Sequence, residues 1–251
     1  LARQAGFSQI SCSHQVAPVM EYVARTQTTL VDAYLSPIIR NYLSRVCEEL
    51  GGQERVRLNV MTSSGGLVDW KVFSGKDCIL SGPAGGAVAL SRLQVSLNQG
   101  PLIGLDMGGT STDVCRIAGP IECEFESSKA GVRVLTPTLA IETVAAGGGS
   151  VCWFDGVSLR VGPQSAGSMP GPACYGRGGP LTITDLNVHS GRIPPSQFPS
   201  PLDPPSINRR IDELLEQVAP AFGTWTREQL VEGFRRLASE QMAEAVRGFV
   251  A

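Results

Sequence analysis

The sequence lacks long apolar runs. Hydrophobic residues make up 42% of its 251 residues, yet the longest unbroken run of them is four residues, as in Val151–Phe154. A helix that crosses a bilayer needs about 20 consecutive apolar residues. The composition therefore excludes a transmembrane protein and a membrane partner, and the length predicts one large domain or two small ones.

Clusters of positive charge are also absent. The chain has 21 Lys and Arg residues against 23 Asp and Glu residues, a net charge of −2, and its basic pairs are no longer than Arg209-Arg210 and Arg235-Arg236. Proteins that bind nucleic acid normally show a basic excess or a basic stripe. We therefore expect no nucleic-acid partner.

Histidine is scarce, and the cysteines follow no metal-binding or disulfide pattern. There are two histidines and seven cysteines; the closest cysteines, Cys115 and Cys123, are eight residues apart, and no Cys-x-x-Cys occurs. The odd count and the wide spacing argue against a disulfide framework and a zinc finger. They favour a reducing, cytoplasmic location, and the two histidines argue against a Ser-His-Asp triad or a His-rich metal site.

The chain begins without Met, and its last segment reads as an amphipathic helix that runs into Ala251. Thr226–Gln229 has the pattern of a capping box, and apolar residues such as Val231, Phe234 and Met242 then recur at helical spacing. We expect the chain to be a piece of a longer polypeptide. We also expect this apolar face to be exposed or buried against a second copy, which favours a homo-oligomer.

Glycine is abundant: 29 of 251 residues are glycine, about 12%, where about 7% is ordinary. The glycines cluster between strand-like runs, which indicates many positive φ angles or close backbone approaches. The periodicity of apolar residues predicts helices over 28–50, with a kink or a new start at Ser36-Pro37, and over 81–93. It predicts strands over 56–60, 102–106, 112–117, 151–154 and 157–161.

The connections between these elements carry signals of their own. Asp155-Gly156 predicts a two-residue hairpin turn. Residues 162–180 contain ten Gly or Pro out of nineteen and are expected to form no regular structure, whereas the proline-rich residues 194–205 are expected to be extended.

The sharpest chemical motif lies between the strands predicted over 102–106 and 112–117. Asp106 ends the first strand, and the turn and the start of the second strand supply glycines and small hydroxyls: Gly108, Gly109, Thr110, Ser111 and Thr112. Such a turn gathers backbone N–H groups that bind anions, and Mg²⁺ typically takes only one or two carboxylates. We predict that these five residues bind nucleotide phosphates and that Asp106 holds Mg²⁺; the alternative is a turn whose glycines serve geometry alone. The motif is neither a P-loop nor a Rossmann fingerprint.

This segment resembles the phosphate-binding hairpin of actin-like ATPases. More narrowly, the chain from Ser11 to Ser200 is similar to the ATP-binding half of the hydantoinase A and 5-oxoprolinase family. The resemblance rests on four motifs in order: Ser81–Gly86, Gly104–Asp113, Thr143–Ser150, and Gly162–Gly167 continuing through Pro170–Tyr175 to Asp185.

The resemblance implies an α/β fold of the actin-like ATPase (ribonuclease H-like) type, partial here, with a β-rich second lobe. Residues 1–100 are then the later part of the first lobe, and residues 101–251 are the start of the second. A first phosphate hairpin is expected before Leu1 and an adenosine loop after Ala251. The implied partners are the remaining segments of the same polypeptide or a separate hydrolase subunit.

The resemblance also implies an activity, with ATP and Mg²⁺ as cofactors. Single-chain relatives convert the cyclic amide 5-oxo-L-proline and water to L-glutamate at the expense of ATP, a step of glutathione metabolism, by phosphorylating the lactam oxygen first. The isolated chain is expected to show no ATP turnover. Alternatives are an ATP-dependent hydantoinase, a subunit of an ATP-coupled ketone carboxylase, or a nucleotide-gated assembly module; the loops after Gly147 argue against the last.

The catalytic residues expected on this basis are Asp106 and Asp185. For Asp185, a capping role is the alternative. Gly147–Ser150 is expected either to contact a ligand or to pack closely at the end of a strand, and Cys174 is expected to be buried rather than nucleophilic.

Overall fold

The computed structural model describes residues 1–129 and 131–249. Its chain divides into two compact units, one made of Leu1–Gly104 and Cys115–Ile141 and the other of Leu105–Val114 and Glu142–Ala251. Each unit is described by itself below.

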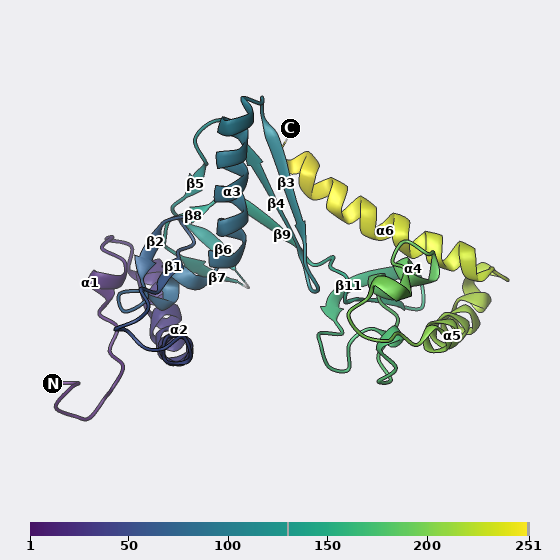
Figure 1. The fold of residues 1–251 in the computed structure, drawn as a ribbon, viewed down its shortest axis with the longest axis horizontal. Coiled ribbons are helices and arrows are strands. Elements are labelled where there is room, and N and C mark those ends of the chain that lie inside the picture. Colours follow the sequence, from purple (N-terminus) through teal and green to yellow (C-terminus); the bar gives the residue numbers. More distant parts are fainter. Residues whose placement is uncertain (130, 250–251) are drawn as a thin grey trace. The chain divides into compact units, whose positions relative to one another are not determined.

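Helices predominate toward the two ends of the chain, and strands follow one another between residues 102 and 165 (Figure 1). The helices are α1 (Ser13–Val16), α2 (Tyr22–Glu49), α3 (Ser81–Leu97), α4 (Ile183–His189), α5 (Pro204–Phe222) and α6 (Arg227–Gly248), with 3₁₀ turns η1 (Gly75–Cys78), η2 (Ala173–Tyr175) and η3 (Pro195–Gln197). The strands are β1 (Asn59–Met61), β2 (Leu67–Asp69), β3 (Leu102–Met107), β4 (Thr112–Ile117), β5 (Cys123–Glu124), β6 (Ser127–Lys129), β7 (Val132–Val134), β8 (Thr138–Leu139), β9 (Ile141–Val144), β10 (Ser150–Phe154) and β11 (Leu159–Ser165). The strand neighbours are β1-β2, β3-β4-β9, β5-β8, β6-β7 and β10-β11.

In the first unit, α2 is one continuous helix that contains Pro37, so Ser36-Pro37 does not start a new helix. Leu43, on the apolar face that periodicity favours, is buried, but the buried stripe also runs through the polar residues Thr28, Asp32 and Ser36. The reason is the Asp32 carboxylate, which accepts hydrogen bonds from the hydroxyl of Ser11 at 2.7 Å and from that of Ser36 at 3.1 Å. These bonds make it possible to bury a polar face.

The predicted helix at Ser81 is confirmed as α3, and the strands on either side of residues 108–111 are confirmed as β3 and β4. A small core in this unit joins α3 to strand residues such as Cys115 and Leu139. At Gly104 of β3, an added Cβ would lie 2.8 Å from both Leu90 and Cys115. The glycine therefore lets the helix pack directly on the strand.

The larger core belongs to the second unit, where α4, α5 and α6 surround the β10–β11 hairpin (Figure 1). The capping box of Thr226 and Gln229 at the start of α6 is confirmed. Val231 and Phe234 are buried in this unit's own core, so the expectation that they face solvent or a second copy is wrong. Val250 and Ala251, into which the helix was expected to run, lie outside the described residues.

Three further expectations differ from the structure. β10 and β11 pair Phe154 with Leu159, so the turn has four residues rather than two, and the Asp155 carboxylate orders it by accepting from the N–H groups of Val157 and Ser158 at 2.8 and 2.7 Å. β11 continues to Ser165 and η2 follows, so residues 162–180 are not wholly irregular. α5, which was not expected, begins at Pro204.

Within the part of the chain that the structure describes, no helix is long and apolar enough to cross a membrane.

Candidate functional site

The turn between β3 and β4, residues 108–111, lies within the second unit. It is closed by the N–H of Gly108, which donates to the Ser111 carbonyl at 2.8 Å. The carbonyls of Gly108 and Gly109 accept from the N–H groups of Gly148 and Gly149 at 3.0 and 2.6 Å. The turn is therefore fixed by main-chain bonds to the glycine loop of residues 147–149.

These bonds determine where the free N–H groups of the turn point. In a planar trans peptide, the C=O and the N–H point in opposite directions. Because the carbonyls of Gly108 and Gly109 point toward the glycine loop, the N–H groups of Gly109 and Thr110 point away from it. Both residues are exposed, and neither N–H has an acceptor among residues 1–129 and 131–249. Consecutive free N–H groups of this kind form an anion-binding concavity.

The glycine loop lies so close to the turn that side chains do not fit. A Cβ on Gly147 would lie 2.5–2.7 Å from backbone atoms of Thr110 and Ser111, and a Cβ on Gly149 would lie 2.9 Å from the Gly109 carbonyl oxygen. Real Cβ atoms do not approach backbone this closely. Of the two interpretations of this motif, close packing is therefore what the structure supports directly.

Three other segments hold the glycine loop in place. The Gly147 N–H donates to Ser150 Oγ at 2.8 Å. The Gly148 carbonyl accepts from the N–H of Thr184 at 2.7 Å, and the Gly149 carbonyl accepts from the N–H of Ala166 at 2.8 Å. The turn thus rests on a loop that is itself anchored to α4 and to the end of β11.

The hydroxyls of the turn do not all point to the same side. Thr112 is fully buried, and its Oγ1 donates to the Ala146 carbonyl at 2.5 Å and lies 3.6 Å from Met242 Sδ. Thr110 is exposed, with its Oγ1 3.5 Å from Ser165 Oγ. The Thr112 hydroxyl therefore ties the hairpin to the loop, while the Thr110 hydroxyl is open to a ligand.

Asp106 is exposed near the end of β3, and its side-chain carboxylate has no hydrogen-bond or ion-pair partner among the described residues. No three His, Cys, Asp or Glu side chains in the described ranges gather into a metal site. A single free carboxylate beside free N–H donors nevertheless fits Mg²⁺ bound to a phosphate, because this ion keeps several waters and takes few protein ligands.

A polar pair beside the turn was not predicted. Thr143 of β9 donates its hydroxyl hydrogen to Asp113 Oδ1 of β4 at 2.7 Å. Both residues belong to the recognised motifs, but the sequence does not show that β9 lies beside β4, because four strands separate them along the chain. This hydrogen bond links the Asp113 carboxylate of β4 to the neighbouring strand β9.

Asp185 is fully buried. Its Oδ1 accepts from the N–H of Cys174 at 2.7 Å, and its Oδ2 accepts from the N–H of Ala173 at 3.0 Å. The N–H and the hydroxyl of Thr182 also donate to Oδ2, at 2.8 and 2.9 Å, and form the capping box of α4. These four hydrogen bonds make the buried Asp185 carboxylate an anchor of η2 on α4, as the capping interpretation predicts.

Cys174 is buried beside this carboxylate. Burial, followed by the hydrogen bond to Asp185, raises the pKa of its thiol far above the ordinary value. Burial also raises the pKa of Cys152 well above its ordinary value, with a smaller contribution from Asp185. The expectation that Cys174 is buried is confirmed. A nucleophilic cysteine needs the opposite pKa shift, so the direction of this shift argues against a nucleophilic role.

Comparison with known proteins gives consistent matches. Residues 25–251 match the family described as Hydantoinase/oxoprolinase. The chain is 43% identical to the 5-oxoprolinase of Saccharomyces cerevisiae over 259 residues, which cover 98% of this chain and 20% of the yeast protein. It therefore spans about a fifth of the length of that curated relative.

Two solved structures are similar over almost the whole chain. One is a nucleotide-free acetone carboxylase, described in connection with ATP-dependent acetone carboxylation, with a TM-score of 0.83, 26% identity, and coverage of 99% of this chain and 36% of that one. The other is an ATP-dependent caprolactamase from Pseudomonas jessenii, with a TM-score of 0.73, 33% identity, and coverage of 98% and 36%.

Proposed function

Because this chain belongs to the hydantoinase/oxoprolinase family, we propose that it forms one phosphate-binding part of the ATP site of a cyclic-amide hydrolase that opens 5-oxo-L-proline. Its fold is part of the actin-like ATPase fold of that family. The substrate follows from the name of the yeast relative.

The observation that carries the proposal is the pair of free, exposed N–H groups of Gly109 and Thr110 on a turn locked from behind. They supply donors to phosphate oxygens without rearrangement, and the Thr110 hydroxyl adds a third. Preorganised donors of this kind are the main source of catalytic stabilisation where negative charge develops. Gly108 and Ser111 close the turn and hold these donors in register.

Asp106 has the second role in the proposal. Its exposed carboxylate would hold Mg²⁺ when the nucleotide is bound. Placing a divalent cation there offsets the charge of the phosphates, and the carboxylate is the group of this chain whose charge matters most to the reaction.

Thr112 and Asp185 act as positioning residues in this proposal. Thr112 holds the turn on the loop through Ala146. Asp185 holds the segment of Ala173 and Cys174 on α4, and α4 in turn supplies the Thr184 N–H that fixes Gly148. Asp185 therefore acts on the turn of residues 108–111, which we call the phosphate turn, through the main-chain bonds of Thr184 and Gly148.

In the proposed reaction, ATP activates an amide that water alone attacks too slowly. An unstrained amide resists water at neutral pH, and ATP supplies the phosphoryl group that activates the lactam oxygen before hydrolysis. The task of this chain is to hold the transferring phosphate in line with the lactam, which is chiefly positioning and charge stabilisation. One phosphate turn is only half of such a clamp, so the activity belongs to the longer polypeptide.

The organisation of the parent enzyme is also part of the proposal. We assign residues 1–100 to the later part of the first lobe of the parent enzyme and residues 101–251 to the start of its second lobe, with the other phosphate turn, the adenosine loop and the hydrolytic part supplied by the rest of the polypeptide or by a partner subunit. A cytoplasmic homo-oligomer that serves glutathione metabolism fits this assignment.

A second candidate is an ATP-coupled carboxylase that acts on a ketone. The specific observation in its favour is the TM-score of 0.83 to acetone carboxylase, higher than that to caprolactamase. The identity favours the lactamase instead, at 33% against 26%.

The test is a parallel measurement of phosphate and product from the full-length enzyme with ATP and one of three substrates: 5-oxoproline, hydantoin, or acetone with bicarbonate. We expect phosphate release to rise with 5-oxoproline and to match glutamate formation. Phosphate release that responds only to hydantoin or to acetone would assign the alternative activity. No response to any of the three would refute the proposed function.

A further inference from the structure

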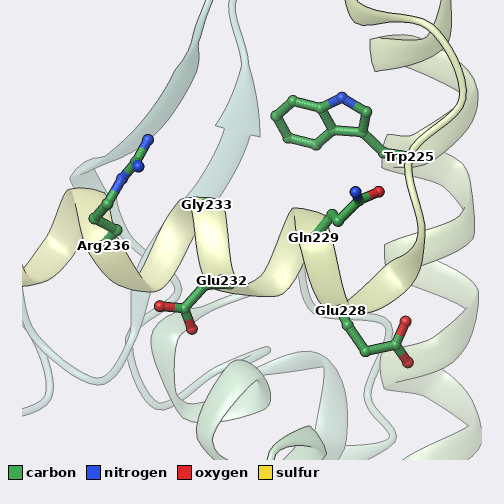
Figure 2. A pocket seen from close by; sticks show the side chains of 6 residues that line it. All are labelled: Trp225, Glu228, Gln229, Glu232, Gly233 and Arg236. Atoms are coloured by element: carbon green, nitrogen blue, oxygen red, sulfur yellow. The ribbon is translucent and has the colours of Figure 1, made fainter.

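One side of α6 bears a hollow of about 580 Å³. It is lined by Trp225, Glu228, Gln229, Glu232, Gly233 and Arg236 (Figure 2). In Figure 2, the indole of Trp225 and the guanidinium of Arg236 stand on the same side of the helix, with Gly233 between them along its axis, whereas the carboxylates of Glu228 and Glu232 point away. The hollow therefore has an aromatic wall, a cationic end and a floor without a side chain.

A second hollow of about 370 Å³ adjoins the first and shares Trp225, Gly233 and Arg236 with it. Its walls are more apolar, since they include Leu159 and Phe222. The Phe222 ring lies 5.4 Å from the Trp225 ring, centroid to centroid, and Phe222 is 44% exposed. We call the two hollows together the α6 groove; it offers aromatic surface to a partner, the residue type most enriched where binding energy concentrates.

The floor of the groove depends on Gly233. A Cβ at this position would lie 3.0 Å from Leu159 Cδ1 and 3.6 Å from the Trp225 ring. A larger residue would therefore occupy the space between the ring and the guanidinium. The absence of a side chain keeps this space open.

The charges around the groove leave one group uncompensated. Glu232 pairs with Arg235 at 2.7 Å, and Glu240 pairs with Arg247 at 2.7 Å. Glu228 accepts hydrogen bonds from its own backbone N–H and from Thr226, and these lower its pKa. Arg236 has no hydrogen-bond or ion-pair partner among the described residues and is exposed. A partner that brings a carboxylate to this guanidinium complements it, and Arg suits such bidentate pairing.

We propose that the α6 groove is the docking site for a segment of the same polypeptide from outside residues 1–251, which places a carboxylate on Arg236 and an apolar side chain against Trp225 and Phe222. The inference rests on the proposed function, in which this chain works within a longer enzyme. The unpaired guanidinium of Arg236 and the aromatic rings of half-buried Trp225 and exposed Phe222 indicate the chemistry of the occupant. Its source is indicated by the yeast relative, four-fifths of whose length lies outside the matched region.

The test is photo-cross-linking in the polypeptide expressed from its complete gene, with p-benzoylphenylalanine in place of Trp225, so that an aromatic group still packs on Phe222. Mass spectrometry then identifies the peptide captured. The second variant is Arg236→Glu. Its matched control is Arg235→Glu, which reverses the charge at the adjacent position, where the native side chain already pairs with Glu232.

We expect a cross-link to a peptide outside residues 1–251 of the same polypeptide, with Asp or Glu close to the captured residue. Arg236→Glu should abolish it, Arg235→Glu should retain it, and changing the acidic residue to Arg in the Arg236→Glu background should restore it. A cross-link confined to residues 1–251, a cross-link between isotope-labelled and unlabelled copies, capture of another subunit, or equal loss in both variants would overturn the proposal.

The assay is independent of the proposed activity. An enzyme that opens 5-oxoproline but gives no cross-link refutes only the docking site, whereas a specific cross-link in a protein without lactam-dependent ATP hydrolysis refutes only the proposed function.

Discussion

The contact between Gly147 and the phosphate turn permits a quantitative prediction for Gly147→Ala. The new Cβ would lie 2.5–2.7 Å from backbone atoms of Thr110 and Ser111, whereas carbon atoms in favourable contact are roughly 3.5–4.0 Å apart. The turn must therefore move by about 1 Å relative to the loop. It cannot do so freely, because the N–H groups of Gly148 and Gly149 hold its carbonyls at 3.0 and 2.6 Å.

Two magnitudes follow from this displacement. Forcing an extra carbon into a well-packed site costs about 1–3 kcal/mol of stability. A shift of about 1 Å in a catalytic array costs on the order of 10²-fold in rate. We therefore expect Gly147→Ala in the full-length enzyme to fold with reduced stability and to lose about two orders of magnitude in kcat for phosphate release.

The control is Gly85→Ala in α3, where a Cβ would meet nothing within 4 Å. Alanine is favoured over glycine in helices by about 1 kcal/mol, so this variant should be as stable as the wild type or more stable, and should keep its rate. Thermal unfolding and lactam-dependent phosphate release are measured for both variants. A Gly147→Ala enzyme with wild-type stability and wild-type kcat would show that the turn does not depend on the loop, and our description of the site would fail.

Three further predictions concern carboxylates. Asp106→Asn should lower kcat by roughly 10²–10³ with a much smaller effect on the KM for 5-oxoproline, since only the charge that faces the transferring phosphate is removed; near-normal rates of both phosphate and glutamate release would refute its role. Asp185→Asn should lower the free energy of unfolding by about 1.5–3 kcal/mol or more, because an amide replaces a buried carboxylate that accepts four hydrogen bonds. It should also make the Cys174 thiol react with a reagent such as Ellman's reagent. Unchanged stability and an unreactive thiol would contradict the anchoring role. For Asp32, burial raises the pKa, but hydrogen bonds led by those from Ser11 and Ser74 outweigh it and leave the folded-state pKa below its ordinary value. The stability that Asp32 contributes is then present above about pH 4 and lost on further acidification, so Asp32→Asn should flatten the acid limb of urea unfolding measured as a function of pH; an unchanged limb would contradict this sign.

The phosphate turn was predictable because its signal is local. Asp106, the glycine pair and the flanking strands follow one another in the sequence, and the structure places β3 and β4 on either side of them. The sequence does not reveal the hydrogen bonds that hold the turn, because Gly148 and Gly149, which donate to the carbonyls of Gly108 and Gly109, lie about 40 residues further along the chain. For the same reason, the inward direction of the Thr112 hydroxyl could not be predicted.

The errors elsewhere have physical causes. In α2, a cluster of hydroxyls around Asp32 makes a polar face the buried one, which apolar periodicity does not report. The sequence of α5 does carry a helical signal, because Ile207, Ile211, Leu214 and Val218 recur at steps of four, three and four and are buried together. The apolar face of α6 packs against β11, α5 and α4, and of these α5 was not predicted from the sequence.

The support of the phosphate turn consists mainly of main-chain bonds, with side chains added at Thr112 and Ser150. Main-chain contacts survive the replacement of most side chains, so mutation can change the substrate pocket without displacing the N–H donors that we propose bind the phosphates of ATP. A family built in this way can keep one phosphate-binding turn while its members differ in the substrate that they activate. The names of three proteins similar to this chain, an oxoprolinase, a caprolactamase and an acetone carboxylase, fit a lineage in which chemistry at the phosphate has been inherited and substrate choice has been free to evolve.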